Sequence, residues 1–265
     1  MLIVGERLNS TAKSVAAAIA SRDLEYVQTQ ARAQVEAGAH YLDLNAAAGM
    51  EREAEDLVWL VEAVQDCVEV PLCIDSPNPQ ALAAGLAACR RPAMVNSTTA
   101  ESERAALVIP LAAKHRAKLV ALTMDDAGMP TTAEQRLALA ERLVAMAAGA
   151  GIPVEDVYID PLVRPVASEP GQGAALLEGM RAIRQQIPGV HLICGLSNIS
   201  FGLPSRKLLN RTFLAMAAAM GLDAAILDPL DPRLMATVAA AEALLGCDEY
   251  CVAYLAAHRA GRLET

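Results

Sequence analysis

Two uncharged polar residues, Ser197 and Asn198, follow closely on a mainly apolar run at positions 191–194. Gly195 lies just after the run, and a Gly-Leu-Pro breaker at 202–204 separates the polar pair from a long apolar helix. This order is typical of a buried strand whose carboxyl end presents hydrogen-bonding groups to a ligand. Asn198 is therefore the first candidate site residue.

Polar residues also stand at the ends of the other apolar runs along the chain. A single Asp in such a place is often only a helix cap, but here every expected strand ends with a polar residue, and none of these is Lys, His or Cys. Besides Ser197 and Asn198, the set comprises Glu6, Asp43, Asn45, Asp75, Asn96, Thr123, Asp125, Asp160 and Asp228.

Carboxylates and amides without a cation make a poor site for a phosphate, and they suit a ligand rich in N–H donors. A buried Asp needs donors around it to stay ionised, and an amino-bearing fused heterocycle such as a pterin supplies them. A divalent metal is the competing interpretation, because Asp and Glu oxygens are hard ligands. The four histidines, at 40, 115, 191 and 258, share no strand-end pattern, so we expect no intrinsic metal.

Strand-like and helix-like segments alternate along the whole chain. The expected strands are 2–5, 40–44, 72–74, 93–95, 119–122, 157–159, 191–194 and 224–227. We expect a long helix at 51–68, a break or kink at Pro110 in the helix at 101–116, and an appended C-terminal helix at 248–262. Eight strands that each precede a helix predict a single (β/α)8 TIM barrel, an α/β fold, with one domain over 1–265. A doubly wound sheet is disfavoured because no G-x-G-x-x-G follows the first strand.

The composition bounds the partners and the compartment. A net charge of −9 argues against a general attraction to nucleic acid or to an anionic membrane. The first residues have no basic signal-peptide region, and no uninterrupted apolar stretch approaches the ~20 residues of a membrane span. The six cysteines form no C-x-x-C pair, which is typical of reduced thiols in the core. We expect a cytoplasmic protein.

Seven stretches, taken in order, resemble one family of pterin-binding enzymes. The sequence is similar to the methyltransferases that move a methyl group between methyltetrahydrofolate and a corrinoid protein, such as methyltetrahydrofolate:corrinoid/iron-sulfur protein methyltransferase, and to the folate module of cobalamin-dependent methionine synthase. The stretches are IVGERLN at 3–9, LDLN at 42–45, CIDS at 73–76, MVNS at 94–97, YIDP at 158–161, GLSNIS at 195–200 and NRTFL at 210–214.

The resemblance implies roles for seven residues. Asp75, Asn96 and Asp160 would bind the polar edge of the pterin, and Gly195 and Ser197 would shape the floor of the pocket. Asn198 would lie near N5, the atom that carries the methyl group, and Arg206 would lie toward the aminobenzoyl-glutamate tail. Asn198 and Asp75 would be the catalytic residues.

The resemblance also implies a reaction and its partners. The methyl group would pass between N5 and the cobalt of a corrinoid carried by another protein, by an SN2 step on or by Co(I), and the enzyme would be a homodimer. Phe201-Gly-Leu departs from the polar segment expected in the iron-sulfur-protein enzymes, so the kind of corrinoid partner stays open. The direction of transfer stays open as well, because no motif of the chain encodes it.

Two other functions remain open on the sequence. A dihydropteroate-synthase-like enzyme would need cations for its pyrophosphate leaving group, and Ser205-Arg206-Lys207 is the sole candidate cluster. A non-catalytic folate-binding protein would need the pocket alone.

Overall fold

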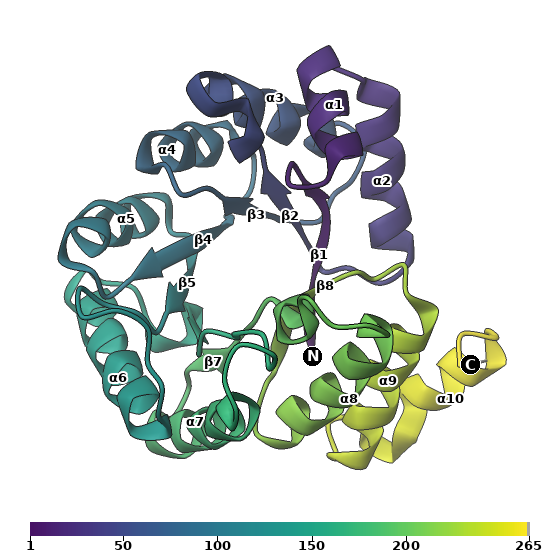
Figure 1. Cartoon of the computed structure of the whole chain (residues 1–265). Helices are drawn as coiled ribbons and strands as arrows, with labels where there is room; N and C mark the ends of the chain where they lie inside the picture. Colours follow the sequence, from purple (N-terminus) through teal and green to yellow (C-terminus); the bar gives the residue numbers. More distant parts are fainter. Residues whose placement is uncertain (264–265) are drawn as a thin grey trace.

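Eight parallel strands form the centre of the computed structural model, which describes residues 1–263. Figure 1 shows the strands around a common axis with the helices outside them. The strands are β1 (Leu2–Asn9), β2 (Tyr41–Asn45), β3 (Leu72–Asp75), β4 (Met94–Thr99), β5 (Lys118–Leu122), β6 (Val157–Asp160), β7 (His191–Leu192) and β8 (Ala224–Leu227).

The helices follow the strands in the order that a (β/α)8 barrel requires, which confirms the predicted fold. The α-helices are α1 (Lys13–Ser21), α2 (Leu24–Glu36), α3 (Glu53–Gln65), α4 (Pro79–Ala88), α5 (Ser102–His115), α6 (Ala133–Gly149), α7 (Gln172–Gln186), α8 (Arg206–Ala219), α9 (Pro232–Leu244) and α10 (Val252–Arg259). Short 3₁₀ turns are η1 (Ala47–Arg52), η2 (Val154–Asp156), η3 (Leu196–Ser200) and η4 (Glu249–Cys251).

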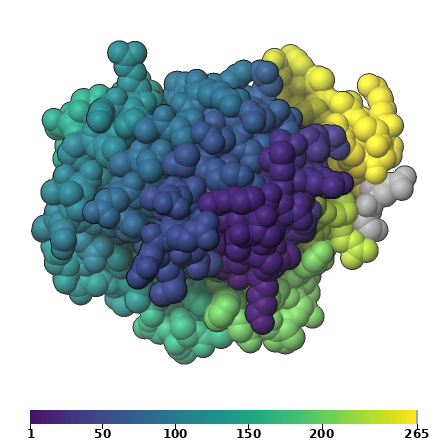
Figure 2. Space-filling model, turned by 90° about the horizontal axis from the view of Figure 1, so that it is seen from above, coloured from purple at the N-terminus to yellow at the C-terminus, as the bar shows by residue number. Residues whose placement is uncertain are grey.

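The sheet runs from β7 through β6, β5, β4, β3, β2 and β1 to β8, and the remaining gap is bridged just beyond β7. The Ile226 amide donates to the Cys194 carbonyl over 2.9 Å, and Gly195 forms a parallel bridge with Ile226. The barrel is therefore nearly closed. The N-terminus contacts a late helix of the barrel, because the amino group of Met1 pairs with Glu242 of α9, and Figure 2 shows the purple N-terminal part beside the yellow C-terminal part.

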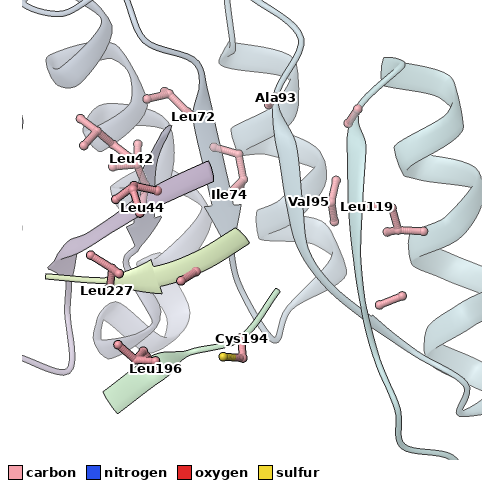
Figure 3. Close-up of a cluster of buried hydrophobic side chains, with 14 of the residues drawn as sticks. Leu42, Leu44, Leu72, Ile74, Ala93, Val95, Leu119, Cys194, Leu196 and Leu227 are labelled. Carbon is pink, nitrogen blue, oxygen red and sulfur yellow. The ribbon is translucent and has the colours of Figure 1, made fainter. Parts of the chain in front are cut away.

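Side chains alternate between the two faces of the sheet, as the geometry of a strand requires. Leu42 and Leu44 of β2 belong to the apolar layer between strands and helices (Figure 3), whereas Asp43 lines the interior of the barrel. Inside the barrel, toward the amino ends of the strands, a second apolar cluster fills the interior. It includes Val4, Cys73, Met94, Val120, Tyr158, Ile193 and Ile226, with Tyr41 packed against it. The barrel is thus a packed core and not a pore.

The structure corrects four sequence-based boundaries. The strand expected at 191–194 ends at Leu192, because the backbone beyond it turns to pair with β8. The helix expected at 51–68 begins at Glu53, after Met50 with a φ of 49°. Helix α5 runs through the exposed Pro110 without a break. The appended helix expected at 248–262 divides into η4 and α10, where Tyr250 and Cys251 both have positive φ.

Candidate active site

A cavity of about 710 Å³ lies at the carboxyl ends of the strands. Every strand or the turn directly after it contributes to the lining, and eight of these residues, one for each strand, stand two positions beyond a residue that belongs to the inner apolar cluster or packs against it. Side chains on one face of a strand recur every second residue, so the inward residue that follows the apolar layer reaches the cavity. The layer changes there from apolar to mainly polar. The eight residues are Glu6, Asp43, Asp75, Asn96, Leu122, Asp160, Gly195 and Asp228.

Amide side chains hold two carboxyl groups on one wall of the cavity. The Asn96 amide donates to Asp43 Oδ1 over 3.1 Å, and the Asn45 amide donates to Asp75 Oδ2 over 3.0 Å. Burial raises the pKa of Asp75 to about 6, and burial together with the charge of Asp75 raises the pKa of Asp43 well above its usual value. Two acids this close do not readily carry full charge together, so this wall can either donate a proton or accept one.

Asp160 lies at the end of β6 and is almost fully buried. Its Oδ1 accepts a hydrogen bond from the Leu162 amide over 2.8 Å, and burial raises its pKa to about 7. A pterin N–H would give this carboxylate the donors that burial otherwise denies it.

The residues after β7 form the floor and edge of the cavity. Gly195 and the η3 residues Ser197 and Asn198 line it together. A Cβ at Gly195 would lie 3.1 Å from Asn198 Nδ2, so that glycine leaves room for the amide. The Asn198 side chain is exposed, and no hydrogen bond within residues 1–263 occupies its amide. Six of the seven residues named from the sequence, Asp75, Asn96, Asp160, Gly195, Ser197 and Asn198, line this one cavity.

Arg206 lies outside this cavity. Its guanidinium donates to the Ser197 carbonyl over 2.7 Å and to Ser200 Oγ over 3.1 Å, and it stands 5.9 Å from the centre of the Phe201 ring. Arg206 lines a smaller cavity beside the first one. In this structure it braces the loop that holds Ser197 and Asn198.

The expectation of a pocket without cations is wrong at one place. Arg7 lines the cavity and forms an ion pair with Asp228 over 2.9 Å. The pairing of β1 with β2 shifts register between Gly5 and Leu8, and this irregularity lets Glu6 and Arg7 both face the cavity. The Asp228 partner neutralises the added charge.

Three strand-end residues lie elsewhere. Thr123 is buried and donates to the Asp160 carbonyl over 3.2 Å, and Asp125 forms an ion pair with Arg142 over 3.2 Å. Asn45 supports Asp75 without lining the cavity.

Sequence reasoning missed several polar residues of the cavity lining, namely Asn9, Thr11, Ser14 and Tyr26. They come from the end of β1, the turn after it, α1 and α2. The signal for Asn9 was its place in the IVGERLN stretch, because β1 extends to this residue and not only to residue 5.

Within residues 1–263, no group of three or more His, Cys, Asp or Glu side chains has an arrangement that suits a metal ion. The same part of the chain includes no helix long and apolar enough to cross a membrane.

A TIM barrel with a polar, carboxylate-lined cavity at its strand ends defines the class of the protein, and comparison with known families defines it further. The sequence model of the pterin-binding enzymes matches residues 5–228. The chain belongs to this family.

Among curated proteins, the chain is 38% identical over 265 residues to the methylcorrinoid:tetrahydrofolate methyltransferase of Eubacterium limosum, with 99% of this chain and 98% of that protein covered. It is 32% identical over 239 residues to the methionine synthase of Mycobacterium tuberculosis, and this match covers 85% of the chain but 20% of that larger protein.

Among solved structures, dihydropteroate synthase from Xanthomonas albilineans in complex with 7,8-dihydropteroate matches with a TM-score of 0.72, 20% sequence identity and 94% of both chains covered. The Yersinia pestis enzyme matches with a TM-score of 0.71, 17% identity and 93% of both chains covered. At these identities the likeness extends to the fold alone.

Proposed function

We propose that the protein is a methyltransferase that moves the N5 methyl group between methyltetrahydrofolate and the cobalt of a corrinoid carried by a partner protein. The observation that carries this proposal is the 38% identity, over almost the whole of both chains, to a methylcorrinoid:tetrahydrofolate methyltransferase. The name of that relative gives the direction from methylcorrinoid to tetrahydrofolate, and we propose the same direction here.

The cavity suits the folate end of this reaction. Asp75, Asn96 and Asp160 offer acceptors for the amino group and ring N–H groups of a pterin, and Gly195 and Ser197 shape the floor. The raised pKa values of Asp75, about 6, and of Asp160, about 7, allow these carboxyl groups to adjust their protonation to the ring.

The exposed amide of Asn198 is the group that we assign to N5. An amide cannot give up a proton at neutral pH, but its hydrogen bond to N5 strengthens as charge develops there. This is a contribution to the transition state more than to ground-state binding. Asp75 would donate a proton to the pterin ring or accept one from it.

The partner would be a corrinoid protein, either an iron-sulfur protein or another cobalamin-binding protein. The remaining sequence-based expectations, a homodimer and a cytoplasmic location, stay predictions. Arg206 would contact the aminobenzoyl-glutamate tail only where that tail leaves the main cavity toward the smaller one.

A dihydropteroate-synthase-like reaction fits less well. Lys207 forms an ion pair with Asp231 over 3.4 Å, Arg206 is bonded to the Ser197 carbonyl, and neither residue lines the main cavity. The one arginine of that cavity is paired with Asp228. A pyrophosphate leaving group would therefore meet no unpaired cation from these residues.

The proposal is tested by incubating the protein with methylcobalamin and tetrahydrofolate and following both the loss of methylcobalamin and the formation of methyltetrahydrofolate. We expect catalysed transfer that persists in the presence of a chelator. Dihydropteroate formation from a dihydropterin pyrophosphate and 4-aminobenzoate, without methyl transfer, would favour the synthase. Folate binding without either reaction would favour a binding protein.

A further inference from the structure

A second cavity of about 330 Å³ lies beside the active-site cavity, between α8, α9 and the end of β8. Three residues, Glu6, Ser197 and Asp228, line both cavities. They therefore form the wall that the two cavities share.

The second cavity has the polar lining that water needs. Lys207, Asn210 and Asp231 contribute to it. A space that water can occupy thus adjoins Glu6, the carboxyl group of β1.

Glu6 connects this space to the reacting end of the main cavity. Ser197 Oγ donates to Glu6 Oε2 over 3.4 Å, and Ser197 directly precedes Asn198, the residue that we assign to N5. A hydroxyl can donate one proton while it accepts another, which is what a relay between two groups requires.

The proposed methyl transfer requires a path for a proton away from N5. The need for this path rests on the proposed function. When N5 of tetrahydrofolate takes the methyl group, the N5–C bond forms, the Co–C bond breaks with its electron pair left on cobalt, and the N5–H bond must also break. In that reaction a folate and a docked corrinoid protein would cover the open mouth of the cavity, so the released proton would need a path that does not cross the mouth.

We propose that Ser197 and Glu6 carry this proton from N5 through the shared wall into the second cavity. The Ser197 hydroxyl accepts the N5 proton and gives its own proton to the Glu6 carboxylate. The resulting carboxylic acid then loses its proton to water in the second cavity. In the reverse direction the same groups return a proton to N5.

The surroundings of Glu6 suit a group that both gains and loses a proton near neutral pH. Burial raises its pKa to about 7, and the charge of Asp228 adds to this, whereas the Ser197 hydrogen bond and the charges of Arg206 and Arg7 lower it. Asp43 also faces Glu6 from β2. A relay group functions best when its pKa lies near the working pH.

The test compares Glu6→Gln with the wild-type protein in transfer from methylcobalamin to tetrahydrofolate between pH 5.5 and 8.5. We expect the wild-type rate to rise with pH as Glu6 becomes a carboxylate. Glu6→Gln should lower the rate about 10²-fold at pH 7 and remove the rising limb near pH 7, while the folate Kd changes less than about threefold. Asp75 and Asp160 titrate in the same range, and a limb that persists unchanged in Glu6→Gln would belong to one of these two groups and overturn the relay.

Two further variants separate the relay from a structural role. Asp125→Asn removes a carboxylate that also follows a strand but pairs with Arg142 and lines neither cavity; its rate and pH profile should match the wild type. Glu6→Ala should lose rate and regain at least tenfold of it with formate, which is small enough to occupy the vacated carboxyl position.

The outcomes are distinct. Equal losses of rate and folate affinity in Glu6→Gln, or a Glu6→Ala variant that formate does not rescue, would contradict the relay while the methyl transfer of the wild type stands. A wild-type protein that transfers no methyl group would remove the proposed function and the relay with it.

Discussion

Among the polar side chains of the cavity, Asn198 differs from Asn96 in what its amide does. The Asn96 amide is committed to Asp43, whereas no hydrogen bond within residues 1–263 occupies the Asn198 amide, which is exposed to the cavity. A free and positioned donor is what a developing charge on a ligand atom can use, because no existing bond has to break first.

Asp160 differs from Asn198 because we expect it to act mainly in binding the ring and not in the transition state. We expect Asp160→Asn to raise the Kd for methyltetrahydrofolate about 10- to 100-fold, because a charged hydrogen bond to the ring contributes about 1.5–3 kcal/mol. The rate from the bound complex should change less than the Kd. Isothermal titration and single-turnover rates measure the two quantities.

Asp125→Asn is the matched control for Asp160→Asn. Asp125 also follows a strand, but it pairs with Arg142 and does not line the cavity. If Asp125→Asn weakened folate binding as much as Asp160→Asn, Asp160 would not be the anchor of the ring.

Residues of the cavity lining were predictable from the sequence where they stand at the end of a strand and their side chains point to the inside of the barrel. Asp75, Asn96, Asp160 and Gly195 each stand two positions beyond an interior apolar residue. Arg206 lies outside the main cavity, where its guanidinium donates to the Ser197 carbonyl, a contact that no local sequence pattern encodes.

At the scale of elements, the irregular ends of strands limited the prediction. Arg7 lines the cavity because the register of β1 shifts against β2. The alternation of side chains along a sequence does not reveal where a strand includes an extra residue. Similarly, β7 ends at Leu192 because the following residues pair with β8 across the closure of the barrel, a long-range contact that no local pattern encodes.

The packing of α4 against β3 and α3 depends on a glycine in the middle of the helix. A Cβ at Gly85 would lie 2.9 Å from Ile74 Cγ2 and 3.1 Å from Leu57 Cδ2. Overpacking costs about 1–3 kcal/mol, which outweighs the gain of about 1 kcal/mol from replacing Gly by Ala in a helix. We expect Gly85→Ala to lower the Tm by about 2–4 °C in thermal unfolding.

Gly149→Ala is the matched control for Gly85→Ala. Gly149 ends α6, and no atom lies within 4 Å of the position its Cβ would occupy. The same substitution there should leave the Tm unchanged or raise it slightly, because it restricts the unfolded chain without a clash. A Gly85→Ala variant as stable as Gly149→Ala would contradict the close packing of α4.

The buried carboxyl groups of the active site lower the stability of the whole protein at neutral pH. Burial raises the pKa of Glu6 to about 7, of Asp160 to about 7 and of Asp75 to about 6, above the ordinary values of 4.5, 3.8 and 3.8. Between these ordinary values and the raised ones, the folded protein binds more protons than the unfolded chain. Its stability therefore falls as the pH rises through this window.

We expect the Tm of the protein without folate to be several degrees higher at pH 5.5 than at pH 8, as measured by calorimetry. The lowered pKa of His40 opposes this trend below about pH 6.5, but it is the smaller contribution because the residue is exposed. A double variant, Glu6→Gln with Asp160→Asn, should flatten the dependence. A wild-type Tm that rises from pH 5.5 to pH 8 would contradict the burial of charge at this site.

The whole barrel was predictable because its eight strands and intervening helices each carry a local pattern, and parallel strands in this number have few arrangements. What the sequence could not supply was the space between elements. The second cavity between α8 and α9, and the place of Glu6 in its wall, follow from packing alone.

In the proposed reaction, this cavity holds a folate whose N5 exchanges a methyl group under the influence of Asn198. Stopped-flow single turnover between methyltetrahydrofolate and reduced cobalamin, with wild type and Asn198→Ala, tests it together with the folate Kd of each protein. We predict a transfer rate about 10²-fold lower in Asn198→Ala and a Kd within about threefold of wild type, because the amide acts mainly in the transition state. An unchanged rate, or a loss of affinity equal to the loss of rate, would contradict the claim.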